Sequence, residues 1–142
     1  MMLLTAMAYL VTLLIFVGID LVWLTFVGGP VYREALGDLL LPSVRMQPAL
    51  AFYLIYPLGL TMFAVHPGLT GGTIANAMLA GALYGFFTCA TYDLTNHATL
   101  RNWTMAVTAM DIGWGCVLGA ITAAAALAIT PAIASALGLS AH

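Results

Sequence analysis

Residues 73–96 read TIANAMLAGALYGFFTCATYDLTN, an apolar run long enough to cross the hydrocarbon layer of a bilayer as one helix. Within it, small residues recur every four positions, at Ala77, Gly81, Gly85 and Cys89. This spacing keeps side chains on one slowly drifting face of a helix, and small side chains there let a second helix approach closely. Asp93 continues the same register. The stretch therefore predicts a membrane-spanning helix whose packing face ends at a carboxyl group.

The next apolar run, from about Trp103 to Thr130, carries a matching pattern. An acid and three small residues stand four positions apart in it: Asp111, Gly115, Gly119 and Ala123. We expect the two runs to form an antiparallel helix pair that packs through these small faces. Pro131 is expected to end or kink the second helix.

The composition of the chain indicates an all-α, polytopic membrane protein. Hydrophobic residues make up 63% of the sequence and charged residues 6%, and the mean hydropathy is +1.08, far outside the range of soluble domains. The 142 residues hold about four spans and short connections, so residues 1–142 are interpreted as a single domain. A net charge of -2 argues against nucleic-acid binding, which needs a basic surface. Cys89 and Cys116 both lie in predicted spans, so packed thiols are favoured over a disulfide.

Two further spans precede this pair. Leu3 to Val27 forms the first, and Gly28-Gly29-Pro30 is expected to end it. No basic region precedes this run, so we interpret it as a span and not as a cleaved leader. Pro30 to Pro42 has charged residues on one side and apolar residues at helical spacing, which predicts a short interfacial helix, with an ordinary polar loop as the alternative. Pro48 to His66 forms the second span, closed by Pro67-Gly68.

Three acids are predicted to converge on one side of the membrane. Asp20 lies about eight residues before the end of the first span, and Asp111 lies about eight residues into the fourth. Because successive helices alternate in direction and rise about 1.5 Å per residue, both lie roughly 12 Å below the same face, with Asp93 shallower. Every arginine lies on that side, which the positive-inside rule makes cytoplasmic. Both termini are then expected in the periplasm, for a multi-pass protein of the bacterial inner membrane.

An acid inside a membrane helix needs a physical explanation. An Asp at the centre of a span costs about 2.5–3.5 kcal/mol on insertion scales. In the folded protein it must be protonated, paired with a cation such as Arg101, or hydrated by a polar cavity. Alternatively, Asp93 and Asp111 only bind helices together through hydrogen bonds.

The segment YDLTNHATL, residues 92–100, followed by Trp103, Asp111, Trp114 and Gly115, resembles the pattern of a family of small bacterial inner-membrane proteins described as a domain of unknown function. Asp20 with Trp23 and the Tyr32 to Leu40 segment are similar to that pattern as well. The resemblance covers nearly the whole chain and implies a compact four-helix membrane protein. It implies no activity or cofactor, so the roles of residues must come from their chemistry.

The leading hypothesis is a site near the cytoplasmic leaflet that binds or modifies a lipid or another apolar small molecule. A protonated carboxyl group could act there as general acid while an ionised partner acts as base, which leaves an enzyme and a binding protein both open. His97 could move protons, although a histidine at a helix end is more often merely interfacial. The catalytic candidates are Asp20, Asp93, His97 and Asp111. The candidates for ligand contact are Trp23, Tyr92, Asn96, Arg101, Trp103 and Trp114.

Two other functions stay open. Intramembrane acids also mark proton- or cation-coupled channels and transporters. No acid lies in the half of the membrane near the termini, so such a pathway would need a homo-oligomer formed through the small-residue helix faces. A structural accessory subunit is the other alternative. A metal at Asp20, Asp93, His97 and Asp111 is possible on ligand chemistry, but the sequence lacks Glu-x-x-His spacing and we expect none. The expected partners are membrane lipids, and no cofactor is identified.

Overall fold

The structure, a computed structural model, describes residues 1–139, and in this range it consists of helices and connecting turns without a strand. Four continuous helical runs are long and apolar enough to cross a membrane, which confirms the expected fold class. The first run comprises α1 (Met2–Trp23), the π-helical η1 (Leu24–Gly28), α2 (Gly29–Leu36) and the 3₁₀ turn η2 (Gly37–Leu39). The second comprises α3 (Met46–Leu60), the π-helical η3 (Thr61–Val65) and α4 (His66–Leu69). The third and fourth are α5 (Ile74–Thr99) and α6 (Met105–Ala136).

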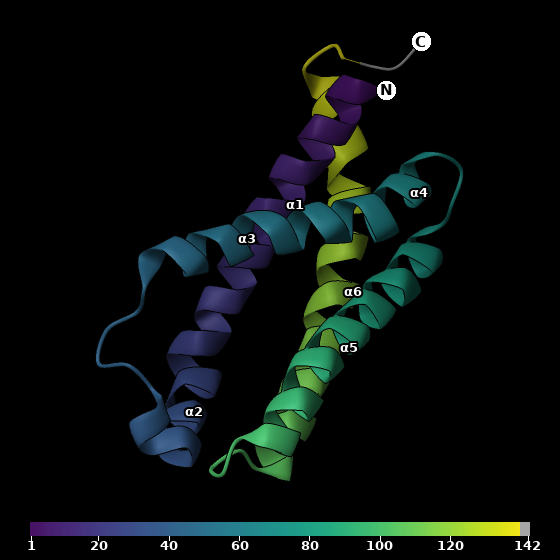
Figure 1. Cartoon of the computed structure of the whole chain (residues 1–142). Coiled ribbons are helices and arrows are strands. Elements are labelled where there is room, and N and C mark those ends of the chain that lie inside the picture. Colours follow the sequence, from purple (N-terminus) through teal and green to yellow (C-terminus); the bar gives the residue numbers. More distant parts are fainter. Residues whose placement is uncertain (140–142) are drawn as a thin grey trace.

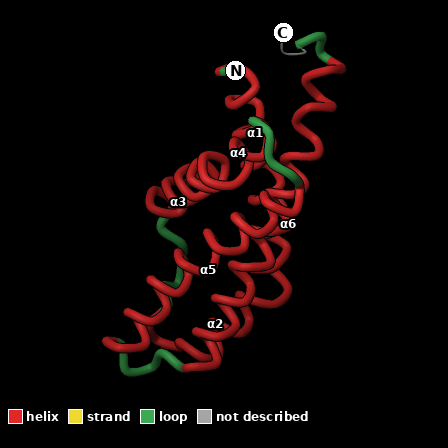
Figure 2. Tube along the Cα trace, turned by 90° about the vertical axis from the view of Figure 1, so that its right-hand side faces the viewer, coloured by secondary structure: helices red, strands yellow, loops and turns green. Residues whose placement is uncertain are grey.

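The helices alternate in direction, and both ends of the chain lie at the same end of the molecule. Figure 1 shows the start of α1 beside the end of α6, with α2 and the turn between α5 and α6 at the opposite end. α6 packs against both α1 and α5, whereas α3 packs mainly against α1, and its continuations η3 and α4 pack against α5. The second run crosses the others obliquely, as the two views show together (Figures 1 and 2). α3 itself meets α5 through side chains, since the Tyr56 ring packs against Tyr84 with a centroid distance of 5.0 Å.

The predicted pairing of α5 with α6 through small residues is confirmed. A Cβ atom added at Gly85 would overlap the carbonyl of Gly115, and one added at Gly81 would overlap the carbonyl of Gly119. The two backbones are in contact at these positions, which is possible only where neither residue carries a side chain. These faces are buried inside the chain, so they are not free surface for association with a second copy.

The predicted break at Gly28-Gly29-Pro30 is wrong, because the helix continues through it to Leu39. A proline inside a helix removes one hydrogen bond, and its ring clashes with the carbonyl four residues earlier. Here the wider π-helical turn η1 ends two residues before Pro30, and η3 likewise ends two residues before Pro67. The π turns change the backbone just where the proline ring would clash. For the same reason α4 extends past the predicted end at His66, to Leu69.

Pro131 also lies inside a helix, since α6 continues to Ala136. The other ends of the third and fourth runs agree closely with the prediction. The Thr73 side chain caps α5 by accepting a hydrogen bond from the Asn76 backbone, and Thr104 caps α6 in the same way through Val107.

The apolar core lies in the half of the bundle that is nearer the termini. It joins α1, η3, α5 and α6 through small and aliphatic residues, namely Ala8, Leu60, Ala64, Val65, Ala77, Ala123, Ala126 and Leu127. The buried acids lie in the other half. One half of the molecule is thus packed through small and aliphatic residues with a few threonines among them, and the three intramembrane acids lie in the half that contains α2.

Candidate functional site

A cavity of about 580 Å³ lies between the first two runs and the α5–α6 pair. Most of its wall is aromatic or aliphatic, and only a few polar groups interrupt it. The lining residues are Phe16, Asp20, Trp23, Leu24, Tyr32, Leu36, Leu40, Ala49, Phe52, Tyr53, Tyr56, Thr88, Cys89, Tyr92, Trp103, Asp111, Trp114, Gly115 and Leu118. Its volume and lining match those of pockets that hold small molecules.

Asp20 joins three helices at the wall of the cavity. Its side chain is 8% exposed. The Tyr53 hydroxyl of α3 donates a hydrogen bond to Oδ2 at 2.7 Å, and the Trp114 indole of α6 donates one to Oδ1 at 3.1 Å. Both carboxylate oxygens are therefore engaged, so this acid positions the wall of the cavity.

Two stacked indoles form the part of the wall beside Asp20. The Trp23 and Trp114 rings lie parallel, with centroids 4.2 Å apart. Gly28 makes this placement possible, because a Cβ atom there would collide with the Trp23 indole. The stacked pair thus depends on Gly28, the last residue of η1.

Asp111 and Asp93 lie together on the facing helices α6 and α5. The Tyr32 hydroxyl of α2 donates a hydrogen bond to Asp111 Oδ1. One ligand atom from each of Cys89, Asp93 and Asp111 lies within 4.8 Å of the others. Asp93 is 0% exposed, and neither of its carboxylate oxygens has a hydrogen-bond partner within the described part of the chain. The predicted convergence of the acids is therefore confirmed as geometry, in the form of two linked sites.

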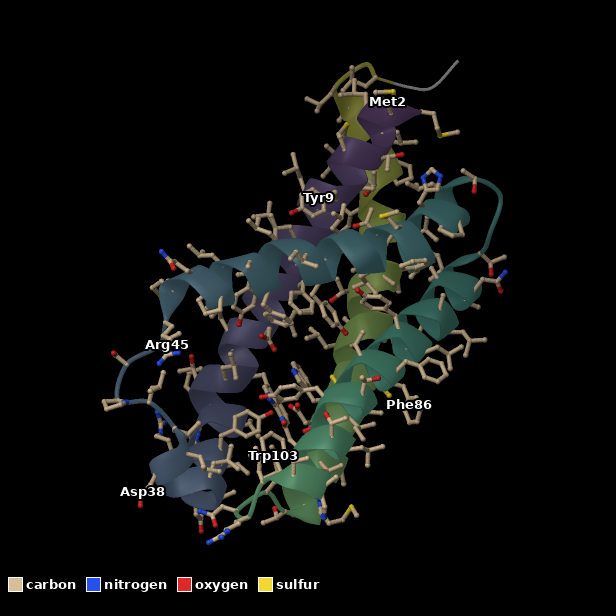
Figure 3. All side chains as sticks on the ribbon, viewed as in Figure 1. Met2, Tyr9, Asp38, Arg45, Phe86 and Trp103 are labelled. Atoms are coloured by element: carbon tan, nitrogen blue, oxygen red, sulfur yellow. The ribbon has the colours of Figure 1, made fainter. Side chains whose placement is uncertain are left out.

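Three residues of the cavity wall, from α3, α5 and the segment after η2, reach the protein surface. Residues at its edge are well exposed: Tyr92 is 59% exposed, Phe52 45% and Leu40 38%. Trp103, which Figure 3 labels at the α2 end of the molecule, meets the edge of the Tyr92 ring at a centroid distance of 5.7 Å. The cavity is therefore accessible from the protein surface along this edge.

The structure brings six of the ten sequence-predicted site residues into the cavity wall: Asp20, Trp23, Tyr92, Trp103, Asp111 and Trp114. Asp93 lies behind that wall, beside Asp111. Asn96, His97 and Arg101 are not among the lining residues. His97 Nδ1 instead hydrogen-bonds the Thr108 hydroxyl at 3.4 Å, and the Trp103 indole donates to the same hydroxyl at 3.0 Å. Arg101 is exposed in the turn before α6.

Sequence reasoning missed the contribution of α3 and part of that of α5. The sequence pattern alone gives Tyr53 and Tyr56 no role in the site, and it favours a packed thiol at Cys89. A signal was present, because Ala49, Tyr53 and Tyr56 stand at i, i+4 and i+7 and so share a helix face. The Phe16 ring stacks on Tyr56 at a centroid distance of 4.7 Å, which joins that face to α1.

Comparison with known sequences adds one match. The family described as "Predicted membrane protein (DUF2177)" matches residues 5–128. Neither the curated proteins nor the solved structures contain a match.

Proposed function

Because the chain belongs to this family of predicted membrane proteins, we propose that it binds a lipid or another apolar small molecule in the cavity between its first two runs and the α5–α6 pair. The family description specifies a location and no activity. The argument for a ligand therefore depends on the cavity itself.

One observation carries the proposal: an aromatic-walled cavity of about 580 Å³ with few polar groups in its lining. A pocket of this composition gains free energy by taking apolar surface from its ligand, at about 25 cal/mol per Å² buried. The aromatic rings supply large, rigid contact surfaces. A strongly polar solute would gain little binding free energy in this cavity, since most of the wall offers no hydrogen-bond donor or acceptor.

The position of the opening supports the same class of ligand. Tyr92, Phe52 and Leu40 surround it, and all three belong to the helical runs or to the segment directly after the first run. In a membrane these helices face lipid, so an acyl chain could enter sideways without crossing the water interface. Exposed rings at the edge also suit contact with lipid tails.

The polar groups suggest how such a ligand would be oriented. Asp20 already accepts hydrogen bonds with both oxygens, so it holds Tyr53 and Trp114 in place. Asp111 is only half-buried and lines the cavity, with Tyr32 bonded to one of its oxygens. We assign Asp111 as the group that meets the polar part of the ligand, and in a modifying enzyme it would be the acid or base.

The packing of the other half favours a binding site over a transport pathway within one chain. The apolar core of Ala8, Leu60, Ala64 and their neighbours separates the cavity from the end where the termini lie. Proton pathways use chains of Asp, Glu or His, whereas the buried polar residues beside this core are threonines, namely Thr12, Thr61, Thr122 and Thr130. A cavity closed on one side is the geometry of a binding pocket.

The proposed orientation follows the distribution of arginine. Arg33 in α2 and Arg101 before α6 both lie at the end away from the termini, and Arg45 precedes α3. The positive-inside rule then places the α2 end toward the cytoplasm of a bacterial cell, and the cavity in the cytoplasmic leaflet of its inner membrane.

The proposal is tested by filling the cavity from α3. Ala49 lines the cavity, whereas Ala51 on the same helix is exposed and does not line it. We expect the gently solubilised wild-type protein to retain a specific apolar molecule in native mass spectrometry with lipidomics, A49W to lose it, and A51W to retain it. Asp111→Asn should weaken retention about tenfold with the fold intact. If wild type retains nothing specific, or A49W and A51W retain the same molecules, the binding proposal is wrong.

A further inference from the structure

We propose that Cys89, Asp93 and Asp111 form a binding site for a divalent transition-metal ion, with zinc as the best match. The three residues come from facing positions of α5 and α6, and one ligand atom of each lies within 4.8 Å of the others. Metal–ligand bonds of about 2.0–2.3 Å place the ligands of one ion roughly 3–4 Å apart. An ion would therefore draw the three ligand atoms closer together by roughly 1 Å.

The environment of Asp93 is the strongest reason to place an ion here. The side chain is 0% exposed, yet within residues 1–139 no group donates a hydrogen bond to either carboxylate oxygen. A buried charge is stable only when it is paired or coordinates a metal. The group faces a second carboxylate and a thiol, and a divalent cation between them would offset most of the negative charge of the cluster and supply the partner that Asp93 lacks.

The ligand set points to the class of metal. Magnesium and calcium select oxygen ligands alone, whereas a thiolate with carboxylates suits zinc and related transition metals. Three protein ligands leave one position of a tetrahedral zinc free, which is the arrangement of catalytic zinc sites. Cys89 and Asp111 also line the cavity, so the free position would face its interior.

Neighbouring residues are arranged as supports for such a site. Gly115 leaves the space that the Cys89 sulfur occupies, because a Cβ atom there would collide with Sγ. The Tyr32 hydroxyl donates to Asp111 Oδ1 and so orients that carboxylate. Hydrogen bonds of this kind to a ligand tune metal affinity, typically by about 10- to 100-fold.

This inference departs from the expectation of no metal drawn from sequence. That expectation was based on the lack of Glu-x-x-His spacing and on the interpretation of Cys89 as a packed thiol. The ligand set that the structure brings together contains the cysteine, one Asp from the same helix and one from the next, and it leaves out Asp20 and His97.

The test is a cobalt and zinc titration of the full-length protein in lipid nanodiscs after treatment with a chelator. Cobalt serves as the spectroscopic probe, because a thiolate ligand produces a sulfur-to-cobalt charge-transfer band. We expect one cobalt per chain, a band that zinc abolishes by displacement, and a zinc affinity at least tenfold lower in Asp93→Asn and in Asp111→Asn. Tyr32→Phe should lower the affinity about tenfold.

Two matched controls make the result specific. Cys89→Ser should lose the charge-transfer band, whereas Cys116→Ser, which changes a free cysteine outside the cluster, should keep it. Asp38→Asn removes an exposed carboxylate and should leave affinity unchanged. Absence of stoichiometric binding by wild type, or a band that survives in Cys89→Ser, would overturn the proposal and leave the two acids as a proton-sharing pair. Because the readout is the metal itself, its outcome is independent of whether the cavity retains a lipid.

Discussion

The indole rings of Trp23 and Trp114 stack with their centroids 4.2 Å apart and their planes inclined by 6°. Trp114 also donates a hydrogen bond to Asp20, one helical turn before Trp23 in α1. A single side chain of α6 therefore contacts α1 through both its ring face and its N–H group. This double contact holds together one wall of the cavity.

Replacing Trp114 by Phe should separate the contribution of ring stacking from that of the hydrogen bond to Asp20. The variant keeps an aromatic ring against Trp23 but removes the N–H donor, so Asp20 loses one of its two hydrogen bonds. A hydrogen bond to a charged group contributes about 1.5–3 kcal/mol, and we expect a loss of unfolding free energy in that range. The measurement is reversible unfolding in mixed micelles. An unchanged midpoint would show that the Trp114–Asp20 bond contributes nothing to stability.

Tyr53→Phe should remove the other donor to Asp20, and with it the link between α3 and α1 at this depth. The expected cost is again about 1–3 kcal/mol. Tyr92→Phe removes a hydroxyl at the exposed edge of the cavity and should change stability by less than about 0.5 kcal/mol. Equal effects of the two substitutions would argue against a structural role for Tyr53.

Gly85→Ala tests the contact between the backbones of α5 and α6. The new methyl group would overlap the Gly115 carbonyl, so the helices must separate, at a cost of about 1–3 kcal/mol. Gly113→Ala on α6 is the matched control, since nothing lies within 4 Å of a Cβ atom there. Alanine is the better helix former, so Gly113→Ala should stabilise the protein by up to about 1 kcal/mol. Thermal unfolding of both variants gives the comparison, and destabilisation of equal size would contradict the packing argument.

Topology is open to a direct test with reporter fusions. If the α2 end faces the cytoplasm, alkaline phosphatase fused after Ala136 should be active in the periplasm, and a fluorescent protein inserted at Asn102 should fluoresce. Exchanging the two reporters should abolish both signals. The inverse pattern would move the cavity to the outer leaflet while leaving the fold unchanged.

The sequence by itself determined the class of the protein, the number of its spans and the pairing of α5 with α6. These properties depend on the length of the apolar runs and on the four-residue spacing of small side chains within them. A run of apolar residues must cross lipid as a helix because its backbone groups can pair only within the segment. Residues such as Gly81, Gly85, Gly115 and Gly119 identify a close contact because the missing side chains are themselves the cause of that contact.

Only the tertiary structure decided what surrounds the acids. The helices continue through Pro30 and Pro67 by way of the π turns η1 and η3, and α6 continues through Pro131 as a regular α-helix, although each proline considered alone predicts a break. Tyr32 and Tyr53 reach the acids because α2 extends α1 and because α3 crosses obliquely, and Cys89 of α5 meets Asp111 because α5 packs against α6. The crossing of a membrane helix is set by its packing against other helices and not by its own apolar pattern. The spacing of residues along one helix therefore predicts which face carries a carboxyl group. The hydrogen-bond donors to the acids come from other helices, and the rotation and tilt of those helices cannot be read from their own sequences.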